Sequence, residues 1–236
     1  MNVHRQLLFV VFVAMLMLLG CKNNITHSAS YGKAYEVVVI NDIDSLLYNT
    51  LSVPMKGLPQ IEPTFDVVEI TSDKLKGDSK LVRNIVVLTI DKRQKRVDIS
   101  SKQNVYAQPQ VIINIVAPSQ SSLQIFLKKY GNELRNYLIK TELHRAQGDI
   151  ARQTNVKAAS TIYKMFGIRM QVPPELTTSK VGKNFLWLSN NASSGMVNLC
   201  IYSIGKGKFA QERDSVMRKN ILGEQKGMYM RTASIV

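Results

Sequence analysis

The chain has 236 residues, of which 45% are hydrophobic and 20% are charged. This composition is that of an ordinary folded protein, and it excludes a disordered or fibrous chain. The formal net charge is +14, and residues 1–20 contribute only Arg5 to it. The basic excess therefore belongs to the rest of the chain, where it favours anionic partners by raising their concentration near the surface.

The first twenty residues have the layout of a secretory leader. A polar start with Arg5 is followed by an unbroken apolar run at 7–19. This run is shorter than the roughly 20 apolar residues that cross a bilayer, so cleavage is favoured over a transmembrane helix. Leu18-Leu19-Gly20-Cys21 resembles the lipobox of bacterial lipoproteins, whose cysteine is acylated. We predict a signal peptide at 1–20, lipidation of Cys21, and a tether at 21–31.

The tether also indicates where in the cell the protein is located. Residues 22–30 contain no acidic residue, whereas acids just after the cysteine resemble signals for inner-membrane retention and for surface display. We therefore expect an outer-membrane lipoprotein that faces the periplasm. Display on the cell surface is the alternative.

Hydrophobic periodicity predicts the elements of the exported chain. Continuous or β-branched apolar runs predict strands at 34–40, 65–70, 80–91, 97–100, 111–116, 185–189 and 197–204. Apolar residues spaced by three and four predict helices at 43–51, 119–149, 156–166 and 210–221. Asp42 or Asp44 is expected to cap the first helix, and Ser119 or Ser121 the long second one.

This order of elements favours an α+β fold over a doubly wound parallel sheet. We expect a layered sandwich of mixed or antiparallel sheet with packed helices. A boundary near residue 153 would divide the exported chain into two α+β subdomains of similar size, 32–153 and 154–236. No flexible linker marks this boundary.

The cysteines and histidines give no catalytic or metal signature. Lipidation of Cys21 leaves Cys200 without a partner for an internal disulfide, and its apolar surroundings indicate a core residue. Glu142, His144 and Asp149 lack the spacing that places metal ligands on one helical face, so we interpret them as a solvated helix end. We predict no metal site and no cofactor.

Three further groups of polar residues are interpreted as structural and not as functional sites. Asp66 and Glu69 fall on opposite faces of a predicted strand, which argues against a catalytic carboxylate pair. The serines at 193–194 match no nucleophile motif, and the Gly-Lys-Gly-Lys stretch at 205–208 lacks the spacing of a phosphate-binding loop. Both segments are interpreted as loops.

Basic residues are the candidate binding residues. They form a run in a predicted turn and a second group on the long helix: Lys92, Arg93, Lys95 and Arg96, then Lys128 and Lys129. Anionic lipid, acidic glycan or an envelope protein are the expected partners. Nucleic acid is disfavoured as a partner, because the chain has no recognised nucleic-acid-binding module and its predicted location is outside the cytoplasm. An ordinary solvated charge run is the alternative.

Seven stretches spread along the exported chain carry a resemblance to a known family: 32–39, 57–67, 107–110, 117–118, 184–187, 213–216 and 227–232. Together they resemble an uncharacterised family of bacterial lipoproteins, domain of unknown function 4837 (DUF4837). The resemblance implies a periplasmic or outer-membrane lipoprotein without an established activity. It also implies that the chain is shortened at its C-terminus, because sequences of that family continue beyond the segment that resembles Tyr229-Met230.

The sequence supports two hypotheses of function. The first is a membrane-anchored, non-enzymatic envelope module that binds an anionic component or a protein through its basic surface. The second is an envelope hydrolase that uses scattered carboxylates. The first is favoured, because no catalytic motif accompanies the predicted anchor and the basic charge.

Overall fold

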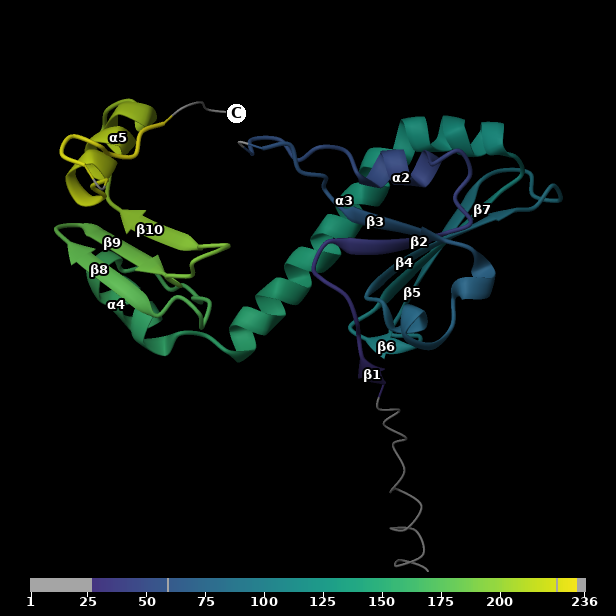
Figure 1. Cartoon of the computed structure of the whole chain (residues 1–236), viewed down its shortest axis with the longest axis horizontal. Helices are drawn as coiled ribbons and strands as arrows, with labels where there is room; N and C mark the ends of the chain where they lie inside the picture. The colour runs from purple at the N-terminus through teal and green to yellow at the C-terminus, as the bar shows by residue number, and fades with distance from the viewer. Residues whose placement is uncertain (1–26, 59, 224, 233–236) are drawn as a thin grey trace, which may run out of the picture.

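The computed structural model describes residues 27–58, 60–223 and 225–232 (Figure 1). The predicted signal peptide and Cys21 lie outside the described residues. The fold is α+β, as predicted. Its elements are β1 (Ser28–Ala29), β2 (Glu36–Ile40), α2 (Leu46–Leu51), β3 (Asp66–Ile70), η1 (Ser72–Lys74), η2 (Gly77–Leu81), β4 (Asn84–Ile90), β5 (Asp98–Gln103), β6 (Ala107–Gln108), β7 (Val111–Ala117), α3 (Gln120–Arg152), α4 (Val156–Phe166), β8 (Thr178–Gly182), β9 (Phe185–Ser189), β10 (Asn198–Tyr202) and α5 (Phe209–Asn220).

The larger sheet is mixed, with strand order β3-β2-β4-β7-β5. The first four strands of this order are mutually parallel, and β5 pairs antiparallel with β7. The charged turn at 92–96 joins β4 to β5, which are not neighbours, because β7 lies between them. Consequently β5 is an edge strand of this sheet.

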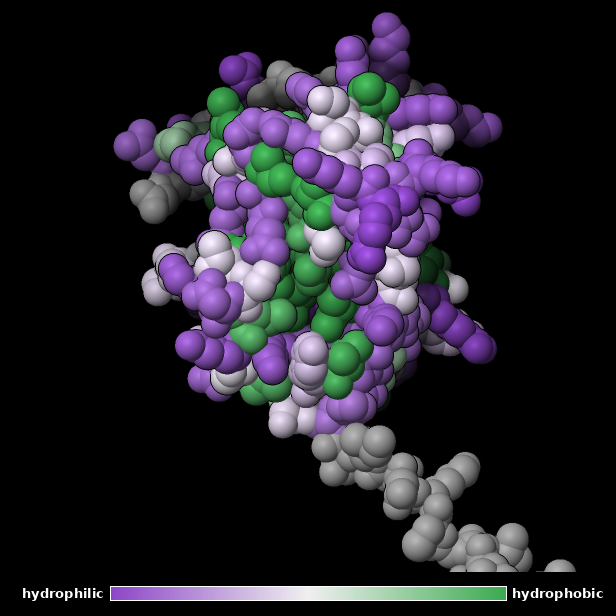
Figure 2. All heavy atoms as spheres, turned by 90° about the vertical axis from the view of Figure 1, so that its right-hand side faces the viewer, coloured by the Kyte–Doolittle hydropathy of each residue, from purple (hydrophilic) through white to green (hydrophobic). Residues whose placement is uncertain are grey.

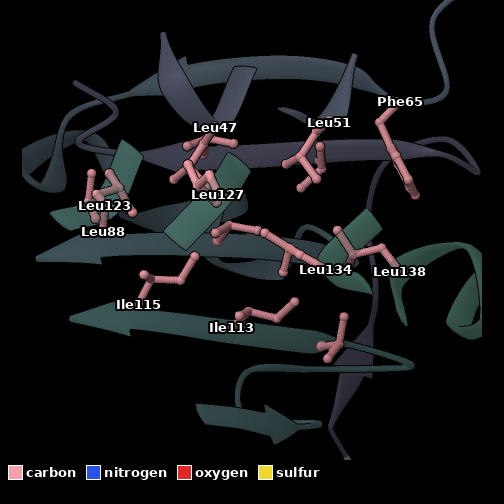
Figure 3. Close-up of a cluster of buried hydrophobic side chains, with 14 of the residues drawn as sticks. Leu47, Leu51, Phe65, Leu88, Ile113, Ile115, Leu123, Leu127, Leu134 and Leu138 are labelled. Carbon is pink, nitrogen blue, oxygen red and sulfur yellow. The ribbon is translucent and has the colours of Figure 1, made fainter. Parts of the chain in front are cut away.

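Both faces of this sheet are apolar, which explains the continuous β-branched runs of β2, β4 and β7. One face carries alternate residues such as Val37, Val86 and Ile113, and it packs against α2 and the first half of α3 (Figure 3). The other face buries a smaller cluster that includes Val38 and Ile85. Figure 1 shows α2 and the first half of α3 together on one side of the sheet.

Side-chain caps begin the two helices that cover the sheet, as predicted. The carboxylate of Asp42 accepts hydrogen bonds from the backbone N–H groups of Leu47 and Tyr48, at 3.0 and 2.8 Å. The Ser119 hydroxyl accepts one from the N–H of Ser122 at 3.2 Å. These bonds satisfy donors that have no partner inside a helix.

The C-terminal elements form a second sheet with its own apolar cluster. Its strand order is β10-β9-β8, all antiparallel, and the predicted pairing of 185–189 with 197–204 is confirmed by β9 and β10. Strand β8 was not expected, because its residues are polar and mostly exposed. The cluster joins Ile162 and Val172 to Leu186 and Leu188.

Cys200 lies on β10 opposite Trp187 and is half-buried. Burial raises the pKa of its thiol above the ordinary value, because desolvation disfavours the thiolate. The nearby guanidinium of Arg213 acts in the opposite direction but more weakly. The thiol is therefore held in its less reactive, protonated form.

Candidate ligand groove between β5 and α3

A surface groove of about 440 Å³ separates the edge strand β5 from α3. The register of β5 on β7 places Ile99 opposite Ile115 and Ser101 opposite Ile113, so these side chains share the face that α3 covers. The small Ser101 leaves room under the helix. The α3 wall is a stripe of residues spaced by three and four: Phe126, Tyr130, Glu133, Leu134 and Tyr137.

A second hollow of about 560 Å³ continues the groove toward the start of β5. The two hollows share Ile99, Phe126 and Tyr130. Arg96 and Lys129 line the second hollow, together with the acidic Asp98. Two basic segments that are far apart in the sequence therefore meet at one end of an apolar groove.

The face of the molecule on the right-hand side of Figure 1 is partly apolar. Figure 2 shows a continuous band of hydrophobic atoms on this face, with hydrophilic atoms on both sides. Three of the groove residues are large hydrophobic side chains that stay substantially accessible: Ile99 is 44%, Tyr130 is 40% and Tyr137 is 37% exposed. Accessible apolar surface of this kind marks binding sites on folded proteins.

The other predicted basic residues do not line the two hollows. Lys92 and Lys95 are exposed on the turn between β4 and β5, and Lys128 is exposed on α3. Arg93 is held by Asp91, whose two carboxylate oxygens accept from its guanidinium at 2.9 Å each. These hydrogen bonds lower the pKa of Asp91 to about 2.

Lys129 also contacts the aromatic wall. Its ammonium lies over the ring of Tyr130, 4.9 Å from the ring centroid. A cation over an aromatic face is attracted by the negative centre of the ring. This contact directs Lys129 along the groove end where Arg96 also lies.

A buried polar cluster fixes α3 on the sheet beyond the groove. The Glu142 carboxylate accepts from Asn84 Nδ2 at 2.7 Å and from Arg145 Nη1 at 2.6 Å, and it pairs with Arg83 Nη2 at 3.0 Å. Arg145 also donates to Asn84 Oδ1 at 2.8 Å and to the Arg83 carbonyl at 3.0 Å. Because these bonds require one rotation and one axial position of α3, they set the direction in which its groove residues point.

The interpretation of Glu142 as part of a solvated helix end is wrong. Its side chain is 1% exposed, and that of Arg145 is 7% exposed. A sequence signal was present: Glu142 and Arg145 continue the buried stripe of Leu134 and Leu138 at spacings of four and three. Desolvation lowers the pKa of Arg145, whereas the charge of Glu142 acts in the opposite direction.

A third hollow, of about 390 Å³, lies beside this cluster at the far end of β5. His144 lines it, with Gln103, Tyr137 and Lys140. The Gln110 amide holds its floor by donating to the carbonyls of Lys80 and Val82, at 2.6 and 2.8 Å. Within residues 27–58, 60–223 and 225–232, no group of three or more acidic, histidine or cysteine side chains could hold a metal ion.

The remaining polar candidates lie apart from the groove. Asp66 pairs in register with Glu36, and Glu69 with Val39, so the two acids fall on opposite faces of β3 as predicted. Glu69 contacts the Ser45 hydroxyl at 3.4 Å. The stretch at 205–208 connects β10 to α5, and Glu212 accepts from the N–H of Gly205 at 3.3 Å.

Comparison with known families finds two uncharacterised domains in this α+β chain. A family model described as Domain of unknown function (DUF8532) matches residues 30–151, more than half of the chain. The chain therefore belongs to that family. A second model, Domain of unknown function (DUF4837), matches residues 155–236.

The predicted resemblance to DUF4837 is confirmed over the last third of the chain. The stretches between 32 and 118 that we also compared with DUF4837 lie instead in the residues that match DUF8532. No curated protein and no solved structure matches the chain. None of the helices within the described residues combines the length and the hydropathy of a membrane-spanning segment.

Proposed function

We propose that this chain is a lipid-anchored, non-enzymatic binding module of the bacterial cell envelope, tethered through Cys21 to the outer membrane and facing the periplasm. The predicted signal peptide and the lipobox support the lipid anchor and the location in the cell envelope. Two or three acyl chains give stable attachment, because each buried methylene contributes about 0.8 kcal/mol and a single chain holds only marginally. The hydrolase with scattered carboxylates remains a prediction from sequence.

The observation that carries the binding role is the convergence of two basic segments at the groove. Arg96 and Lys129 line one hollow, and Lys92, Lys95 and Lys128 are exposed on the same turn and helix. We call these five residues the basic end. Each basic residue near an anionic surface contributes about 1 kcal/mol at physiological salt. The basic end is therefore suited to an anionic envelope component, either a lipid headgroup or an acidic glycan.

A vesicle assay tests the binding role. The exported chain with Cys21→Ala should bind vesicles of phosphatidylglycerol, and binding should fall as salt rises from 50 to 500 mM, values chosen to shorten the screening length from roughly 14 to 4 Å. Changing the basic end to glutamine should weaken binding by at least about tenfold. The variant carries Lys92→Gln, Lys95→Gln, Arg96→Gln, Lys128→Gln and Lys129→Gln.

The matched control removes the same number of charges elsewhere. It carries Lys157→Gln, Lys164→Gln, Lys206→Gln, Lys208→Gln and Lys219→Gln, all at exposed positions. If this control weakens binding as much as the first variant, the attraction is a property of net charge and not of the basic end. The same comparison with acidic envelope glycan in place of vesicles separates the two anion sources.

A separate experiment tests the anchor. Native protein should carry acyl chains on Cys21 by mass analysis, and the Cys21→Ala protein should leave the membrane fraction. In addition, the native protein should resist protease in intact cells and be digested in lysed ones. Digestion in intact cells would instead indicate the cell surface.

A further inference from the structure

The outer edge of β5 offers backbone groups that the sheet does not use. The N–H of Asn104 donates to the Gln110 carbonyl at 3.0 Å, in the register that pairs β5 with β7. Residues of an antiparallel pair alternate between facing the partner strand and facing away. The N–H and C=O groups of Ile99, Ser101 and Gln103 therefore point away from β7, toward the open edge.

The pairing of β7 with β4, its neighbour on the other side, supports the same alternation of backbone directions. The N–H of Val111 donates to the Arg83 carbonyl, which precedes β4, so Val111 directs its backbone away from β5. Val111 is the register partner of Gln103. In the part of the chain that the structure describes, β5 pairs with β7 alone.

The same three residues direct their side chains toward α3, over the groove. An additional strand on this edge would bond to the backbone of Ile99, Ser101 and Gln103, and every second side chain of that strand would enter the groove. From Phe126 to Tyr137 the helix rises about 16 Å. At about 3.3 Å per residue this length accommodates roughly five residues of an extended chain.

Charge selects the direction of such a strand. Arg96 and Lys129 lie at the start of β5, so an antiparallel partner would bring its own C-terminal carboxylate to them, whereas a parallel partner would bring its N-terminal ammonium. Glu133 on the wall disfavours an acidic side chain in the middle. At the far end a carboxylate would meet the exposed ammonium of Lys140, because Arg83 and Arg145 share Glu142 in the buried cluster. At the start of β5 Asp98 offsets one of the two charges, but the guanidinium of Arg96 offers a carboxylate two parallel hydrogen bonds, which an ammonium does not.

We propose that the open edge of β5 binds the C-terminal segment of a partner protein as an added antiparallel strand, with alternate apolar side chains in the groove and the terminal carboxylate at Arg96 and Lys129. This inference goes beyond the proposed function, because it requires neither the lipid anchor nor a membrane surface.

A defined peptide set tests the proposal on the exported chain with Cys21→Ala. The probes are fluorescent heptapeptides with threonine at alternate positions and valine, leucine or phenylalanine at the others, each made with a free and with an amidated C-terminus. We expect members with a free carboxylate to bind in anisotropy measurements. Amidation, or Arg96→Gln with Lys129→Gln, should weaken them by about tenfold, since hydrogen bonds to charged groups are the strong ones.

Two substitutions at one position separate strand addition from simple filling of an apolar groove. Ser101→Pro removes an N–H that the sheet does not use, so it should abolish binding. Ser101→Ala keeps this N–H and loses only the hydroxyl that accepts from Tyr137, so it should still bind. Lys140→Gln is the matched control for charge and should also have little effect. If Ser101→Pro does not fold, N-methylation of alternate peptide bonds in the best probe supplies the same test.

Three results would overturn the proposal: no peptide bound at about 1 mM, binding that survives Ser101→Pro and probe N-methylation, or equal affinity for free and amidated peptides. Dodecyl phosphate that binds in the groove where peptides do not would point to a lipid instead, and would equally overturn it. Ser101→Pro should leave vesicle binding unchanged, so failure of this proposal and failure of the proposed function are distinguishable.

Discussion

Removal of the Glu142 carboxylate should destabilise the fold strongly. Glu142→Ala leaves the guanidinium of Arg145, 7% exposed, without its nearest counter-charge, and it deprives Asn84 of an acceptor at 2.7 Å. Breaking a buried ion pair on one side costs about 3–5 kcal/mol. For a chain of this size each kcal/mol corresponds to roughly 2–4 °C, so the melting temperature should fall by about 6–20 °C.

Urea denaturation followed by circular dichroism measures this loss. Asp149→Ala is the matched control, because Asp149 pairs with Arg152 at the same i,i+3 spacing on the same helix, with side chains 65% and 72% exposed. An exposed pair contributes about 0.2–1 kcal/mol. The reasoning is refuted if Glu142→Ala costs no more than Asp149→Ala. A cycle with Arg145→Ala should show strong coupling between the two positions.

Three further predictions concern single sites. In an NMR titration the Asp91 carboxyl should have its midpoint at about pH 2, and Arg93→Gln should move it toward the ordinary value of 3.8; the contribution of the pair to stability is present above that ordinary value and lost as the pH falls through about 2. Cys200 should react with iodoacetamide more slowly in the folded protein than in urea, and the pH midpoint of the folded rate should lie above the ordinary 9.0; an equal rate in both states would contradict its burial. Gly131→Ala should destabilise the fold by about 1–3 kcal/mol in urea denaturation, because the new Cβ would lie 2.7 Å from Thr50 Cγ2, whereas in a Thr50→Ala background the same change should stabilise α3 by about 0.5–1 kcal/mol.

The sequence predicted those elements whose signal is local. Buried strands such as β2 and β7 have continuous β-branched runs, and α3 has a serine cap and an apolar stripe. Strand β8 escaped prediction, because an exposed strand of the smaller sheet has no apolar alternation. Predicted helix and strand positions elsewhere differ from the structure by only a few residues.

The candidate site was less predictable, because it depends on contacts between distant segments. Arg96 and Lys129 were recognised only as members of separate basic groups, and nothing local indicates that they line one hollow. The position of β7 between β4 and β5 makes β5 an edge strand, and this follows from strand order. Glu142 was predicted to be solvated because it is charged, although its spacing from Leu134 and Leu138 places it on the buried stripe of α3.

The buried cluster at the end of the groove also constrains how sequences of this family can diverge. The side chains of this cluster bond to one another, so replacement of one leaves the others with an unpaired charge or hydrogen-bonding group. The four residues are Arg83, Asn84, Glu142 and Arg145. An apolar quartet of similar volume would satisfy the same space. Across homologues we therefore expect these four positions to covary, with the polar set either retained together or exchanged together.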